Sequence, residues 1–179
     1  MSAIKLSTPS SGSISLTPAD TASDVTITVP ATTATMAING PAFSATISSD
    51  QTVSSGVWTK MQFNTEQFDT NSNFDSSTNY RFTPTVAGYY QVNLTTTGGT
   101  TASYQSVQTS IYKNGSAYCS ANWYLSGNYI WGGASTATAV IYFNGSTDYV
   151  EGYIFLAGSG TLSASSNACR FSGALIRSA

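Results

Sequence analysis

The sequence contains no histidine, and this absence removes much of the chemistry that a catalytic site needs. Histidine is the usual general base near neutral pH, a common metal ligand and a member of the serine-histidine triad. Only eight acidic residues are present, and none forms a spaced pair typical of glycoside hydrolysis. Asp69 and Asp75 flank Phe74 and could form a carboxylate pair, but their setting favours turn residues. We therefore predict that the protein is not an enzyme and needs no cofactor or metal ion.

Charge is the second scarcity, because only 8% of the residues are Asp, Glu, Lys or Arg. The six basic residues are dispersed, so the sequence predicts no nucleic-acid binding. No hydrophobic run reaches the length of a membrane span, which argues against membrane insertion. Residues 1–7 lack the apolar core of a signal peptide, so we expect synthesis in a cytoplasm. A β-rich chain with few charges has little protection against edge pairing, which favours burial of its edges in an oligomer.

Cysteine is scarce as well, with Cys119 and Cys169 the only two. In a cytoplasmic product we favour reduced core residues over a disulfide, and both interpretations stay open. Cys169 shares strand parity with Phe171, which favours its burial. Asn-x-Ser/Thr triplets occur at Asn93, Asn114 and Asn144. They could accept glycans, but the Asn-Gly pairs at the last two positions favour hairpin turns.

What the sequence does hold is a ladder of spaced aromatic residues that leads into an alternating strand pattern. Its members are Phe63, Asp69, Phe74, Phe82 and Gly88, followed by Tyr90, Val92 and Leu94. The last three lie two residues apart, so in a strand they point to one face. Gly88 suits a tight turn or a close backbone approach. No stretch has a sustained helical period, and the sequence therefore predicts an all-β chain with aromatic anchors between two sheets.

This ladder closely resembles the signature of the C1q-like globular head, a member of the complement C1q and tumour necrosis factor (TNF) superfamily. Four other segments resemble the family's first strand, central hairpin, Gly-Asp-x-Val strand and closing strand, in that order: residues 41–45, 111–115, 146–150 and 171–176. The resemblance implies a homotrimeric jelly-roll β-sandwich of about ten strands over residues 41–179. Some C1q-like heads bind calcium, and Asp148 or Asp75 could contribute oxygens here. Without an Asp-x-Asp-x-Asp cluster, we prefer solvated turn carboxylates.

The run from Tyr149 to Leu156 is apolar on both strand faces. Val150, Ile154 and Leu156 share one face, and Tyr149, Tyr153 and Phe155 share the other. One face of a sandwich strand meets the core, so the second is expected to meet a neighbouring subunit. The residues that we predict in the core or the trimer interface are Phe63, Phe74, Phe82, Tyr90, Tyr149, Tyr153, Phe155 and Phe171.

A second aromatic group lies between residues 118 and 131, among Asn, Ser and Gly. It consists of Tyr118, Trp123, Tyr124, Tyr129 and Trp131. Aromatic rings among small polar residues suit recognition of a carbohydrate or a protein. Aromatic rings also fill cores and subunit interfaces, and we prefer that interpretation, with surface recognition as the alternative.

Residues 1–40 differ in composition, being rich in Ser, Thr, Ala and Pro, and we expect them to form an N-terminal arm. Ile14 and Leu16 alternate, as do Val25, Ile27 and Val29, which predicts two or three short strands. Two or three short strands cannot bury a core by themselves. The arm is therefore expected to intertwine in the trimer and bind a partner protein.

Segments 12–18 and 24–31 resemble stretches common in structural proteins of tailed bacteriophages, and no Gly-x-y collagen repeat is present. We therefore expect a virion surface protein, made in the host bacterial cytoplasm. Its arm would bind a capsid or tail protein. Forty residues reach at most ~130 Å when extended, which favours a capsid decoration (cement) protein or a short head fibre. The alternative is a receptor-binding tail-fibre tip that adheres to host surface glycans.

Overall fold

The structure is a computed structural model that describes residues 4–7, 13–16, 40–99, 102–129, 133–166 and 168–179. For residues 4–7, 13–16 and 126–129 it describes the backbone alone. The chain divides into two compact units, Met1–Ala34 and Thr35–Ala179. In the first unit, β1 (Ile4–Ser7) and β2 (Ser13–Leu16) pair antiparallel, with Ile4 opposite Leu16. The expected strand around Ile14 is thus confirmed, whereas residues 25–29 lie outside the described ranges.

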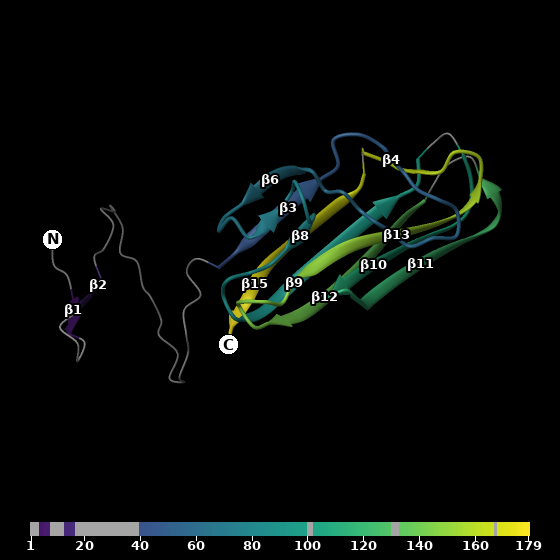
Figure 1. Ribbon diagram of the computed structural model, residues 1–179. Helices are drawn as coiled ribbons and strands as arrows, with labels where there is room; N and C mark the ends of the chain where they lie inside the picture. The colour runs from purple at the N-terminus through teal and green to yellow at the C-terminus, as the bar shows by residue number, and fades with distance from the viewer. Residues whose placement is uncertain (1–3, 8–12, 17–39, 100–101, 130–132, 167) are drawn as a thin grey trace, which may run out of the picture. The chain divides into compact units, whose positions relative to one another are not determined.

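The second unit is a sandwich of two antiparallel sheets (Figure 1). The five-stranded sheet has the order β12-β9-β15-β3-β6: β12 (Ala134–Phe143), β9 (Gly88–Thr97), β15 (Arg170–Ser178), β3 (Ala42–Thr46) and β6 (Thr65–Asp69). The six-stranded sheet has the order β11-β10-β13-β8-β7: β11 (Ser116–Tyr129), β10 (Ser103–Lys113), β13 (Val150–Ser159), β8 (Arg81–Phe82) and β7 (Phe74–Asp75). Its sixth strand, β5 (Thr59–Lys60), also pairs with β13, while β4 (Gln51–Thr52) pairs with β14 (Ser163–Ala164).

The chain passes repeatedly from one sheet to the other, as in a jelly roll. β8 lies in one sheet and β9 in the next, and β12, β13 and β15 alternate between sheets in the same way. The predicted all-β jelly roll is confirmed. The expected number of about ten strands was too low, because thirteen strands are described from residue 42 on, and five of them are only two residues long. No helix occurs in the described ranges, and hence none long and apolar enough to cross a membrane.

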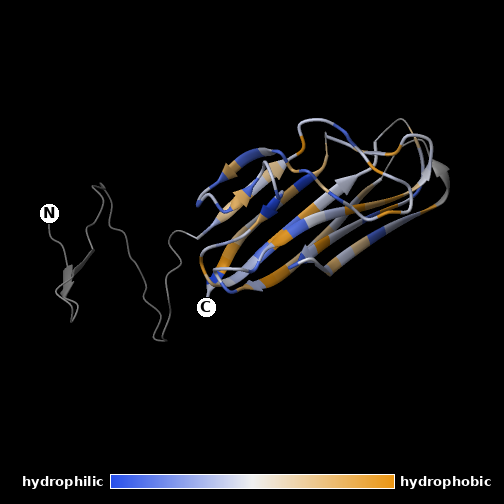
Figure 2. Ribbon diagram, viewed as in Figure 1, coloured by the Kyte–Doolittle hydropathy of each residue, from blue (hydrophilic) through white to orange (hydrophobic). Residues whose placement is uncertain are grey.

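The core is aromatic and has Phe43 near its centre. Its ring stacks on those of Phe82 and Phe74 at 4.3 and 4.9 Å between centroids, and it meets Phe171 edge-on at 5.0 Å. Five of the residues predicted in the core or the trimer interface are buried: Phe63, Phe74, Phe82, Tyr90 and Phe171. Along β9, buried residues alternate with more exposed ones, so this strand gives one face to the core. Hydrophobic residues recur along the other long strands as well (Figure 2).

Local turn chemistry sets the ends of several strands. Asn114 and Gly115 both have positive φ, 51° and 80°, as a two-residue hairpin between β10 and β11 requires, which confirms the predicted central hairpin. A side chain at Gly88 would collide with the carbonyl oxygen of Arg177, which confirms the expected close approach.

Two expectations for the segment before β13 were wrong. Asn144-Gly145 is not a hairpin turn, because β12 and β13 lie in different sheets and do not pair. The Asn144 side chain instead accepts hydrogen bonds from the backbone amides of Ser146, Thr147 and Asp148 and so caps the crossover loop. Residues 146–149 belong to this loop, and the strand begins only at Val150.

Candidate functional site

The predicted interface residues Tyr149, Tyr153 and Phe155 lie on or beside the outer side of the six-stranded sheet, where they are half-buried. The chain itself covers part of each ring. Tyr112 stacks on Tyr153 with 4.0 Å between centroids, and Trp58 lies 5.5 Å from Phe155. The guanidinium of Arg81 sits 4.5 Å above the ring of Tyr149. Much of the apolar area that we expected to need a neighbouring subunit is therefore covered within one chain.

Large exposed apolar side chains gather instead on the strands of the five-stranded sheet. Among the described residues, nine large hydrophobic side chains are exposed, and five of these nine lie on this sheet: Phe68, Tyr89, Val140, Tyr142 and Ile176. We call the outward side of the sheet with these residues the apolar face. Tyr89 and Tyr142 are backbone partners on β9 and β12, and their rings are 5.4 Å apart. Such a concentration is typical of a surface that another protein covers.

The polar groups in the middle of the apolar face are uncharged and satisfy one another. The side-chain amide of Gln91 donates to Thr138 Oγ1 at 2.7 Å, and this hydroxyl donates to Asn93 Oδ1 at 2.6 Å. Beside these hydrogen bonds, small residues such as Ser172 and Ala174 line a hollow of about 220 Å³. Groups already paired within the chain lose little when water is removed, so this face can be buried at low cost.

The apolar face was missed at the level of sequence, although a signal for it exists. Ile141 and Phe143 alternate and are buried, and Val140 and Tyr142 beside them are apolar too but exposed. Apolar residues on both faces of a strand led us to predict an interface only for β13. The same criterion applied to β12 would have identified this surface.

The aromatic group of β11 does not form one continuous surface. Tyr118 and Tyr124 are exposed, and Tyr124 is opposite Ser106 on the outer side of the sheet. Trp123 is opposite the buried Val107 and therefore points to the other side, where its ring lies directly against Gly133. The backbone of Tyr129 pairs with β10, but its side chain, like all of Trp131, lies outside the described atoms.

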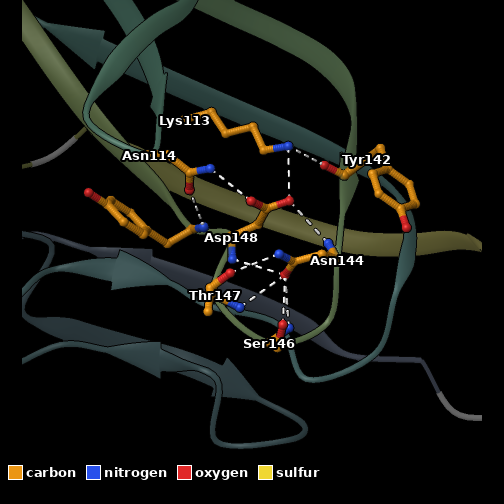
Figure 3. A network of polar contacts seen from close by, with 8 residues as sticks. Lys113, Asn114, Tyr142, Asn144, Ser146, Thr147 and Asp148 are labelled. Carbon is orange, nitrogen blue, oxygen red and sulfur yellow. Dashed lines mark hydrogen bonds and ion pairs between the residues drawn. The ribbon is translucent and has the colours of Figure 1, made fainter.

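Asp148 belongs to a polar network that ties the β10–β11 hairpin to the crossover loop (Figure 3). Its carboxylate accepts hydrogen bonds from the side-chain amide of Asn114 at 2.7 Å and from the backbone of Asn144 at 3.1 Å. Lys113 forms an ion pair with it at 3.1 Å and also donates to the carbonyl of Tyr142. These contacts, above all the Asn114 amide, hold the pKa of Asp148 below its ordinary value. Both carboxylate oxygens thus have structural partners.

The remaining candidate carboxylates are turn residues, as the preferred interpretation states. Asp69 accepts from the backbone amide of Phe74 at 2.7 Å, and Asp75 accepts from those of Ser77, Thr78 and Asn79. Within the described ranges, no three His, Cys, Asp or Glu side chains lie close enough to hold a metal ion. Both cysteines are free, and burial raises the pKa of the Cys169 thiol to about 11. The apolar face therefore remains the best candidate site, and it is suited to association with another protein through burial of its apolar side chains.

Solved structures with the same fold are heads of C1q and TNF proteins. The globular domain of zebrafish complement 1qA protein is 20% identical, with a TM-score of 0.57, over 78% of this chain and 99% of that one. Murine APRIL is 7% identical, with a TM-score of 0.57, over 77% and 100%. Eiger TNF from S. frugiperda is 10% identical, with a TM-score of 0.55, over 78% and 93%. No protein-family model and no curated protein sequence matches the chain. The expected C1q/TNF-like jelly roll is thus confirmed at the level of fold.

Proposed function

We propose that the protein is a non-enzymatic structural component of a tailed-bacteriophage particle, a homotrimer whose C1q/TNF-like head projects from the particle. The observation that carries this proposal is the apolar face, which gives the head a surface suited to self-association. Side chains of this kind contribute about 1.5–3 kcal/mol each when fully buried. Since Tyr89, Val140 and Tyr142 are about half exposed, each has roughly 1 kcal/mol still to gain.

The attachment of the head to a particle is assigned to residues 1–40. Their resemblance to bacteriophage structural segments supports this role, and so does the position of Gly40. The backbone of Leu175 donates to the carbonyl of Pro41, so the chain enters the head near the end of the closing strand β15. The opposite end of the sandwich is then free to face outward. We place the protein on the virion surface, as a capsid decoration protein or a short head fibre.

A receptor-binding tail-fibre tip is the second candidate function. The exposure of Tyr118 and Tyr124 on the edge strand β11 favours it, because aromatic rings that are open to solvent can stack against host surface glycans.

Quantitative mass spectrometry of purified particles, calibrated against the major capsid protein, tests the proposal. One trimer for every few capsid subunits is the result expected for a decoration protein. A few trimers per particle would replace that role by a fibre tip. Absence from purified particles would overturn the virion assignment.

A further inference from the structure

A polar pocket lies where the chain leaves β3, at the far end of that strand from Gly40. It has a volume of about 350 Å³, near the lower limit of small-molecule sites, which span roughly 300–1,000 Å³. Its lining residues are Ile47, Ser49, Asp50, Gln51, Thr52, Gln62 and Asn64. Figure 1 shows the loop from β3 to β4 at the end of the sheets away from the C terminus. If residues 1–40 attach the head to a particle, this end is open to solvent.

Two side-chain amides hold the walls of the pocket in place. Gln51 donates to the carbonyl of Lys60 at 2.8 Å and accepts from the backbone amide of Gln62 at 2.9 Å, so its side chain pairs with the neighbouring segment as a strand would. Asn64 accepts from the backbone amide of Ser48 at 2.9 Å and donates to the hydroxyl of Ser48 at 3.0 Å. A pocket fixed in this way loses little conformational entropy when a ligand binds.

Other polar groups of the pocket keep hydrogen-bonding capacity that no described residue uses. The hydroxyls of Ser49 and Thr52 and the side-chain amide of Gln62 form no hydrogen bond within the described ranges. Asp50 uses one carboxylate oxygen to accept from the backbone amide and hydroxyl of Ser166, both at 2.7 Å, and its second oxygen has no partner in those ranges. The backbone contact in particular holds the pKa of Asp50 below its ordinary value, so the group is ionised at neutral pH.

These groups define the chemistry of a ligand. Amide and hydroxyl groups both donate and accept, and a carboxylate oxygen accepts, which matches the adjacent hydroxyls of a sugar. Among the described lining residues there is no Lys or Arg, and Asp50 is negative, so a phosphate or an acidic sugar would be repelled. Of the described lining residues only Ile47 has an apolar side chain, so a lipid or an aromatic ligand would bury little apolar area here.

We infer that this pocket binds a neutral sugar residue, with Asp50, Thr52 and Gln62 as its hydrogen-bonding groups. The inference deepens the proposed function, because it names a ligand class for the outward end of the head. In a trimer, three such pockets would act together, so that a weak single site could still hold a multivalent glycan surface.

Titration of the full-length, isotope-labelled protein with D-glucose, D-galactose or N-acetyl-D-glucosamine, followed by amide NMR, tests this inference. At least one of these sugars should shift the amide signals of Ser49, Thr52 and Gln62, and N-acetylneuraminic acid should not. Gln62→Ala should weaken binding at least tenfold, because it removes one of the hydrogen-bonding groups of the pocket. The exposed Gln62 side chain forms no hydrogen bond within the described ranges, so the fold should stay intact. Gln105→Ala, at an exposed glutamine outside the pocket, is the matched control and should bind like the wild type.

The inference is overturned if no neutral sugar shifts these signals, if Gln62→Ala binds as well as Gln105→Ala, or if the shifts centre on Tyr118 and Tyr124. These outcomes are separate from a failure of the proposed function. A protein that binds sugar but is absent from particles refutes only the virion assignment. A particle-bound trimer that binds no neutral sugar refutes only the pocket.

Discussion

Replacement of Val140 by Asp should dissociate the proposed homotrimer without unfolding its subunits. The Val140 side chain is 52% exposed on the apolar face, so a carboxylate there is solvated in the single chain. In the assembly, each interface would lose roughly 1 kcal/mol of apolar burial and bear part of the desolvation cost of a charge, which is several kcal/mol for a buried ion. A total of about 3 kcal/mol per interface corresponds to a loss of about 10² in the association constant.

Val57 offers a matched control, because it is also a valine with 52% exposure but lies in the segment before β5, away from the apolar face. Size-exclusion chromatography with light scattering over a dilution series should show Val140→Asp as a monomer and Val57→Asp as a trimer. Tyr153→Asp provides the contrast with the outer side of the six-stranded sheet. The reasoning is refuted if Val140→Asp stays trimeric and Tyr153→Asp dissociates, since the interface would then lie on that other sheet.

Further predictions concern the stability and reactivity of the single chain. Phe82→Ala removes a fully buried ring and should lower the free energy of unfolding by about 3–5 kcal/mol in a denaturant titration; a loss below about 1 kcal/mol would contradict the aromatic core. Asp75→Ala should cost about 1 kcal/mol at neutral pH through loss of a turn cap. The backbone amide of Thr78 above all holds the pKa of Asp75 below its ordinary value, so this stabilisation is present above about pH 4 and is lost as the pH falls below it. Thermal melts should therefore separate wild type and variant at pH 7 and converge in acid, and a constant gap would count against the linkage. Iodoacetamide should modify Cys119 faster than Cys169, which is buried with a pKa raised to about 11; equal rates by mass spectrometry would be the contrary result.

The parts of the fold that sequence could predict are those set by local chemistry. Alternation at Tyr90, Val92 and Leu94 predicts the inward face of β9, because side chains of a strand alternate whatever the strand pairs with. Asn114-Gly115 predicts the β10–β11 hairpin, because few other residues adopt two positive φ angles in succession. These signals need no knowledge of distant contacts.

The parts that sequence could not predict depend on distant partners. Asn144-Gly145 is the same pair of residue types as Asn114-Gly115, which forms a hairpin turn. It lies in a crossover loop only because β12 and β13 belong to different sheets. The sequence pattern indicates that Tyr153 points outward without a partner. In the structure, Tyr112, which is distant in sequence, stacks on its ring. The sequence pattern pointed to the six-stranded sheet, whereas the exposed apolar residues gather on the five-stranded sheet. The exposure of a side chain depends on its neighbours in space as well as on the pattern of its own strand.

Native mass spectrometry of the full-length protein tests the central claim of self-association most directly. The chain has a mass of 18.7 kDa, so a homotrimer should appear at about 56 kDa, three times that value, and should persist on dilution. A single species at 18.7 kDa under conditions in which the strands are folded would contradict the claim, because the apolar face would then be open to water with no copy of the chain to cover it.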